Sequence, residues 1–168
     1  MNRHSGSLAK PIRVRIADRL LVIGGVLTAG AALLHVGIII GGPDWYRFFG
    51  AGERMARMAA RGSMQPALVT ATIAAILAVW ALYAFSGAGV IRRLPFLRFA
   101  LTLIAAVYLA RGLLGVPAVM LMDDVYTNQL RAKPTFMLVS SAVCIVLGVC
   151  YAVGAARAWK SSSALRPE

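Results

Sequence analysis

The chain has 168 residues, of which 60% are hydrophobic and 14% are charged, and its mean hydropathy is +0.74. Soluble domains contain about 45–50% apolar and about 25% charged residues, so this composition excludes an ordinary soluble domain. The net charge of +12 would indicate nucleic-acid binding in a soluble protein. In a chain this apolar, Arg and Lys flank membrane helices and contact anionic lipid, so we expect membrane lipid and no nucleic acid as partners.

Four apolar segments are long enough to cross a bilayer, because about 20 helical residues span the ~30 Å hydrocarbon core. Arg111 and Pro117 interrupt the third of them. These segments define a four-helix transmembrane domain at 19–158, between a cytoplasmic leader at 1–18 and a cytoplasmic tail at 159–168. The predicted spans cover residues 20–41, 67–85, 96–122 and 136–156.

The first span shares features with a secretory signal peptide, since it follows a basic leader and contains the small residues Ala29 to Ala31. The apolar region of a signal peptide is only about 7–15 residues long. Here the apolar run continues through Ile40. We therefore expect a retained membrane anchor.

The basic residues are distributed unevenly between the two sides of the membrane. Eleven Lys and Arg residues lie in the leader, the second connection and the tail, against six in the first and third connections. Because cytoplasmic segments carry the excess of basic residues, we expect both termini in the cytoplasm and the first connection outside. The richness in Arg, Ala, Val and Gly, with the small size, indicates a multi-pass protein of the bacterial cytoplasmic (inner) membrane.

Small residues recur at helical spacing in three spans, which marks faces that pack against other helices. Together with the short connections they predict an all-α fold, an up-down bundle of four transmembrane helices. The stripes comprise Gly24, Thr28, Ala31 and His35 in the first span; Ala67, Ala71, Ala74, Ala78 and Ala81 in the second; and Ser140, Cys144, Gly148, Ala152 and Ala156 in the fourth.

Common motifs of catalysis and cofactor binding are missing. Cys144 and Cys150 are six residues apart on one predicted helix and form no CxxC pair, so we expect them to pack rather than carry out redox chemistry. The sequence has no P-loop, dinucleotide-binding or HExxH motif. The only other histidine is His4 in the leader, so His35 lacks a second histidine for haem. We expect no metal, no other cofactor and no catalytic residue.

His35 and Arg111 lie well inside the spans, where ionisable residues mark functional sites by default. His35 is nine residues before Asp44, and Arg111 is twelve before Asp123, so both fall in the outer half of the membrane. Tyr108 lies one turn before Arg111. The pattern predicts a polar site at the outer mouth of the bundle. In the alternative, structural interpretation, Arg111 extends its side chain to water and His35 bonds to a helix carbonyl.

The first outer connection combines aromatic and basic residues. Gly41, Gly42 and Pro43 are expected to stop the first helix. Residues 51–61 predict a short amphipathic helix on the membrane surface. The sequence leaves two interpretations open, a lipid-anchored connector or a lid over the polar mouth. The aromatic residues at the start of the connection are expected to anchor it at the depth of the lipid headgroups: Trp45, Tyr46, Phe48 and Phe49.

The lid interpretation makes a specific structural prediction. Arg111 has no carboxylate within any span, and an unpaired cation there is costly. Glu53 lies in a Gly-flanked turn that is conformationally permissive. We hypothesise that the connection folds back so that Glu53 meets Arg111, with Asp123 and Asp124 as competing partners.

The segments YRFFGAGERMAR, PALVT, YAFSGAG, RLPFLR and YLARGL resemble those of small, uncharacterised four-span bacterial membrane proteins. The resemblance extends from His35 to about Gly115. It implies a four-helix membrane fold and no established activity or catalytic residue.

Two classes of function stay open. The first is a non-enzymatic membrane protein that binds a lipid or another small molecule, or acts as an accessory subunit with a membrane partner protein or as a homo-oligomer. The second is a membrane enzyme or small transporter in which His35 handles protons and Arg111 binds an anion. Such work usually needs a carboxylate, and the spans contain none, which favours the first class.

Overall fold

The structure is a computed structural model that describes residues 6–121 and 134–163. These residues form helices joined by turns and contain no strand. Four of the helices are long and apolar enough to cross a membrane, which identifies a multi-pass membrane protein, and the short helix lies in the first connection as expected. The five helices are α1 (Gly6–Phe48), α2 (Glu53–Ala60), α3 (Gln65–Gly87), α4 (Leu97–Leu121) and α6 (Pro134–Ser163).

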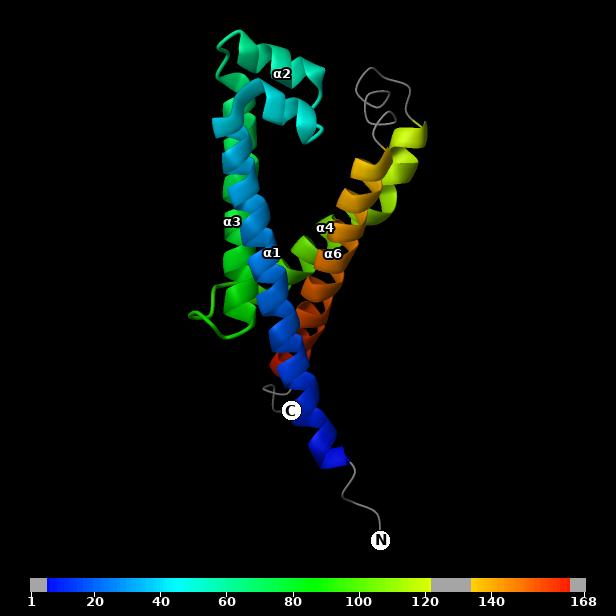
Figure 1. Cartoon of the computed structure of the whole chain (residues 1–168). Coiled ribbons are helices and arrows are strands. Elements are labelled where there is room, and N and C mark those ends of the chain that lie inside the picture. The colour runs from blue at the N-terminus through cyan, green and yellow to red at the C-terminus, as the bar shows by residue number, and fades with distance from the viewer. Residues whose placement is uncertain (1–5, 122–133, 164–168) are drawn as a thin grey trace.

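The long helices pair as two hairpins, α1 with α3 and α4 with α6 (Figure 1). We call the end that contains the start of α1, the α3–α4 turn and the end of α6 the basic end, and the opposite end the α2 end. The hairpins meet towards the basic end, where α1 packs on α6, and they diverge towards the α2 end. The predicted all-α, four-helix up-down arrangement is confirmed.

Glycines allow the closest helix contacts, as expected where helices pack in lipid. A Cβ atom at Gly24 would lie 3.1 Å from Cys150 Cβ, and one at Gly148 would lie 2.7 Å from Leu109. These contacts confirm the predicted stripes at Gly24, which joins α1 to α6, and at Gly148, which joins α4 to α6. The fourth-span stripe is wrong at Ala156, which is exposed. In α3 the predicted stripe is wrong at Ala71 and Ala78, which are exposed. The helix instead buries the face with Thr70, Ala74, Leu77 and Ala81.

The end of α1 differs from the predicted stop. Gly42 adopts φ 68° and ψ −151°, a conformation that favours glycine, and the chain bends there but continues as helix to Phe48. After the bend, the last turns of α1 fold back against the part of α1 that precedes it. Ile38 and Tyr46 of α1 and Ala56 of α2 form a small buried cluster there. The short helix therefore docks on α1 through apolar contacts.

Candidate functional site

A cluster of polar groups lies at the centre of the bundle and draws one residue from each long helix. The Thr28 hydroxyl of α1 lies 3.2 Å from the Tyr108 hydroxyl of α4 and 3.2 Å from the Tyr151 hydroxyl of α6. The Tyr151 hydroxyl also lies 3.0 Å from the Trp80 carbonyl oxygen of α3. We call these four residues the central node.

The central node satisfies its own hydrogen-bonding groups. Each hydroxyl carries one proton, and all three contacts form if Tyr108 donates to Thr28, Thr28 to Tyr151, and Tyr151 to the Trp80 carbonyl. The Tyr108 ring packs edge-on against Trp80 at 5.2 Å and lies 5.7 Å from the Tyr151 ring. A saturated, buried network of this kind fixes the relative position of four helices. Tyr108, expected at an outer polar mouth, therefore belongs to the packed core.

His35 makes a contact within its own helix. Its Nδ1 lies 2.7 Å from the carbonyl oxygen of Ala31, to which it donates a hydrogen bond. The bond requires a proton on Nδ1 and fixes the orientation of the half-buried ring. This geometry agrees with the structural interpretation of His35.

Arg111 lies on the exposed surface of α4, and its side chain runs towards the α2 end. A Cβ atom at Gly115, one turn further along, would collide with Arg111 Nη1 and would lie 3.5 Å from Ser141 Oγ. Within residues 6–121 and 134–163, no carboxylate lies within ion-pair distance of Arg111. The side chain follows the direction expected for a cation that extends from a span towards the headgroups.

The expected pairing of Glu53 with Arg111 is wrong. Glu53 instead accepts two hydrogen bonds from Arg47, at 3.0 Å from Nε and 3.3 Å from Nη2, and lies 4.0 Å from Arg57. These arginines are six and four residues away in the chain, so the turn between α1 and α2 brings them to Glu53. The Arg47 hydrogen bond lowers the pKa of Glu53 below its ordinary value. Asp123 and Asp124, the competing partners of Arg111, lie outside the described residues.

The interfacial anchors are only partly where the sequence places them. Trp45 and Phe48 are exposed and Phe49 is half-buried, as an aromatic belt requires. Tyr46 is only 2% exposed, because the bend at Gly42 turns it into the cluster under α2. The connection also reaches the second hairpin, since the Phe136 ring of α6 packs over Gly50.

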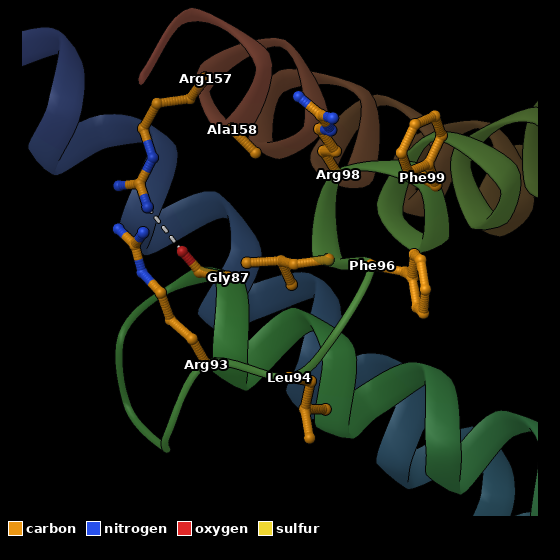
Figure 2. A pocket seen from close by; sticks show the side chains of 9 residues that line it. Gly87, Arg93, Leu94, Phe96, Arg98, Phe99, Arg157 and Ala158 are labelled. Carbon is orange, nitrogen blue, oxygen red and sulfur yellow. Dashed lines mark hydrogen bonds between the residues drawn. The ribbon is translucent and has the colours of Figure 1, made fainter. Parts of the chain in front are cut away.

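A pocket of about 370 Å³ opens at the basic end, beside the α3–α4 turn (Figure 2). Its wall combines three arginines with aromatic and aliphatic residues. The lining residues are Gly87, Arg93, Leu94, Phe96, Leu97, Arg98, Phe99, Arg157 and Ala158.

Arg157 is held in place at this pocket by two other helices. It forms an ion pair with Asp18 of α1, and its Nη2 donates a 2.6 Å hydrogen bond to the Gly87 carbonyl at the end of α3. The side chain of Arg93 points towards Arg157, so the two guanidinium groups face each other (Figure 2). The Arg98 guanidinium lies 4.9 Å from the Phe99 ring and 4.7 Å from the Trp159 ring.

The α3–α4 turn that carries the pocket is fixed by specific hydrogen bonds. Ser86 Oγ donates to the Arg92 carbonyl at 3.0 Å and accepts from the Leu94 amide at 2.9 Å. Phe96 follows with φ 53°, a left-handed conformation that costs a non-glycine residue free energy. Its side chain is 78% exposed. The turn therefore presents an aromatic ring outside the packed core.

Sequence reasoning did not identify this pocket. The sequence analysis used three of its residues, Arg93, Arg98 and Arg157, only to predict the orientation in the membrane. An arginine that flanks a span looks the same in the sequence whether or not it lines a pocket. Two features of the sequence could have indicated it. Asp18 is the sole carboxylate in the leader and the second connection, and the segment RLPFLR places an aromatic residue between arginines. Within the described residues, no group of three His, Cys, Asp or Glu residues could hold a metal ion.

No family model, curated protein or solved structure matches the chain. The resemblance to small four-span bacterial membrane proteins stays a prediction.

Proposed function

We propose that the protein is a non-enzymatic component of the bacterial cytoplasmic (inner) membrane that binds membrane lipid. The leader, the second connection and the tail carry eleven basic residues in the sequence, against six in the first and third connections. This excess supports a cytoplasmic location for the basic end and for both termini. The α2 end then faces outward.

The observation that carries the proposal is the pocket at the basic end. It lies where the spans end, which is where lipid headgroups would lie, and its wall combines arginines with aromatic and aliphatic side chains. A lipid likewise combines an anionic headgroup with an apolar body, and basic pockets between membrane helices bind such headgroups.

The alternative of an enzyme or transporter around His35 and Arg111 has less support. The His35 proton is engaged with the Ala31 carbonyl, and Tyr108 is engaged in the central node. An accessory role beside a membrane partner protein, or in a homo-oligomer, is compatible with lipid binding and belongs to the same proposal.

Native mass spectrometry of the protein, gently extracted from its own membrane, tests the proposal. We expect a population that carries one lipid mass, survives mild activation and returns when lipid is added to delipidated protein. A protein that keeps no lipid, and whose melting temperature does not change when lipid is restored, would overturn the proposal.

A further inference from the structure

We propose that the pocket beside the α3–α4 turn recognises the phosphate of an anionic membrane lipid, with Arg93 and Arg157 as its ligands and Asp18 as a positioning residue. The inference rests on the proposed function and assigns it a site and a ligand chemistry.

The first step is the arrangement of charge. Arg93 and Arg157 direct their guanidinium groups towards each other from the α3–α4 turn and from α6 (Figure 2). Asp18 pairs with Arg157 and is the sole carboxylate near the pocket among the described residues. Arg93 has no ion pair or side-chain hydrogen bond within the same part of the chain. Two facing cations with one carboxylate leave a positive excess that an anion between them would neutralise.

The second step is the fixed position of Arg157. Asp18 and the Gly87 carbonyl each occupy part of a guanidinium that has five N–H donors in one plane. The group is therefore oriented before a ligand arrives and keeps donors for it. A planar fork of donors suits the oxygens of a phosphate, with which arginine makes two parallel hydrogen bonds. Asp18 acts on the ligand through Arg157.

The third step identifies the source of the phosphate. Phe96 and Phe99 line the same pocket as the arginines, and both are exposed. Free inorganic phosphate has no apolar part to cover these rings. The glycerol and the upper acyl chain of a lipid would cover them, which favours a lipid over a free anion.

Lipid binding by the purified full chain, with three probes, tests the assignment. The probes are nanodiscs of phosphatidylcholine, nanodiscs with added phosphatidylglycerol, and inorganic phosphate in detergent. We expect the wild-type protein to retain phosphatidylglycerol in preference to phosphatidylcholine and to gain no thermal stability from inorganic phosphate. Stabilisation by phosphate as large as that by phosphatidylglycerol would overturn the lipid assignment.

Arg93→Gln is the decisive variant, because Arg93 has no described partner whose loss would unfold the protein. We expect it to weaken phosphatidylglycerol retention by about fivefold, as for one arginine at an anionic surface, with an unchanged melting temperature in detergent. Arg92→Gln is the matched control, since Arg92 is the adjacent residue, is exposed and does not line the pocket. Equal retention by both variants would overturn the role of Arg93.

Asp18→Asn tests whether Asp18 positions Arg157 for the ligand. We expect it to weaken retention in the wild-type background but to add little to Arg93→Gln, because both changes disable one phosphate clamp. Full additivity, or lower stability with normal retention, would assign Asp18 to folding alone. If the wild-type protein keeps lipid while no variant alters retention, the site is wrong and the proposed function stands. If the wild-type protein keeps no lipid, the site and the proposed function are both wrong.

Discussion

The Tyr151 hydroxyl of α6 lies 3.2 Å from the Thr28 hydroxyl of α1, although 123 residues separate them in the chain. The same hydroxyl reaches the Trp80 carbonyl of α3 at 3.0 Å. One phenol therefore connects the two hairpins at the centre of the bundle. Bilayer lipid provides no hydrophobic force between helices, so packing and such hydrogen bonds must hold the hairpins together.

Replacing Tyr151 with Phe removes these hydrogen bonds and leaves the aromatic packing in place. We expect a loss of about 0.6–2 kcal/mol in the free energy of unfolding, the range of interhelical hydrogen bonds in membranes. Thr28→Val should cost a similar amount. In the double variant the losses should be clearly less than additive, because each change breaks the same bond. Denaturation in mixed micelles measures these values, and strict additivity would show that the bond contributes nothing.

Replacing Gly148 with Leu tests the contact between α4 and α6. A Cβ atom there would lie 2.7 Å from the Leu109 side chain and 3.1 Å from its backbone nitrogen, so the larger residue must separate the helices. Val149 is 48% exposed on another face of α6, and Val149→Leu is the control. We expect a markedly lower melting temperature for Gly148→Leu only. Equal melting temperatures for the two variants would mean that Gly148 faces lipid.

Acid should loosen α2 from the rest of the protein. The Arg47 hydrogen bond holds the pKa of Glu53 below its ordinary value of 4.5, so the ionised form stabilises the turn. This contribution is present above pH 4.5 and is lost as the pH falls through the lower folded-state pKa. The protection factors of the α2 amides, which are exchange rates corrected for the intrinsic rate at each pH, should fall over that interval in the wild-type protein. Glu53→Gln should show low protection factors that do not change over the interval, and a wild-type profile in this variant would contradict the role of Glu53.

Cysteine labelling tests the orientation in the membrane. In a variant without Cys144 and Cys150, Ser7→Cys and Ser162→Cys should react with an impermeant maleimide only after permeabilisation. Ser63→Cys, in the connection between α2 and α3, should react in intact cells. Labelling of the Ser162→Cys protein in intact cells would show that the orientation is the reverse of the proposed one and that the pocket lies in the outer leaflet.

Periodicity and composition predict the fold well, because the properties that drive it are local. A run of about 20 apolar residues must become a helix in lipid to satisfy its backbone. The bend at Gly42 could not be predicted, since GGP is equally compatible with a helix end. Its consequence is the burial of Tyr46, which the sequence places with the exposed aromatic residues.

The candidate sites were less accessible to sequence reasoning, because they depend on which helix faces which. Glu53 pairs with Arg47, six residues away, and not with Arg111, because the turn between α1 and α2 brings Arg47 beside it. Arg157 is 64 residues from Arg93 in the chain, and only the meeting of the hairpins at the basic end brings both into one pocket. Polar residues within spans are rare and are therefore easy to single out in a sequence. Arg93 and Arg157 cannot be told apart by sequence from the other arginines that flank spans.

Photo-crosslinking with a phosphatidylglycerol analogue tests the central claim, lipid binding at the basic end, most directly. With the reactive group at the glycerol, mass spectrometry of the digested protein should find a modification concentrated at Phe96 to Phe99, and Arg93→Gln should reduce it while Arg92→Gln does not. Excess unlabelled phosphatidylglycerol should abolish it, and phosphatidylcholine should not. Crosslinks spread along all four spans in proportion to their exposed surface, with no effect of Arg93→Gln, would contradict the account.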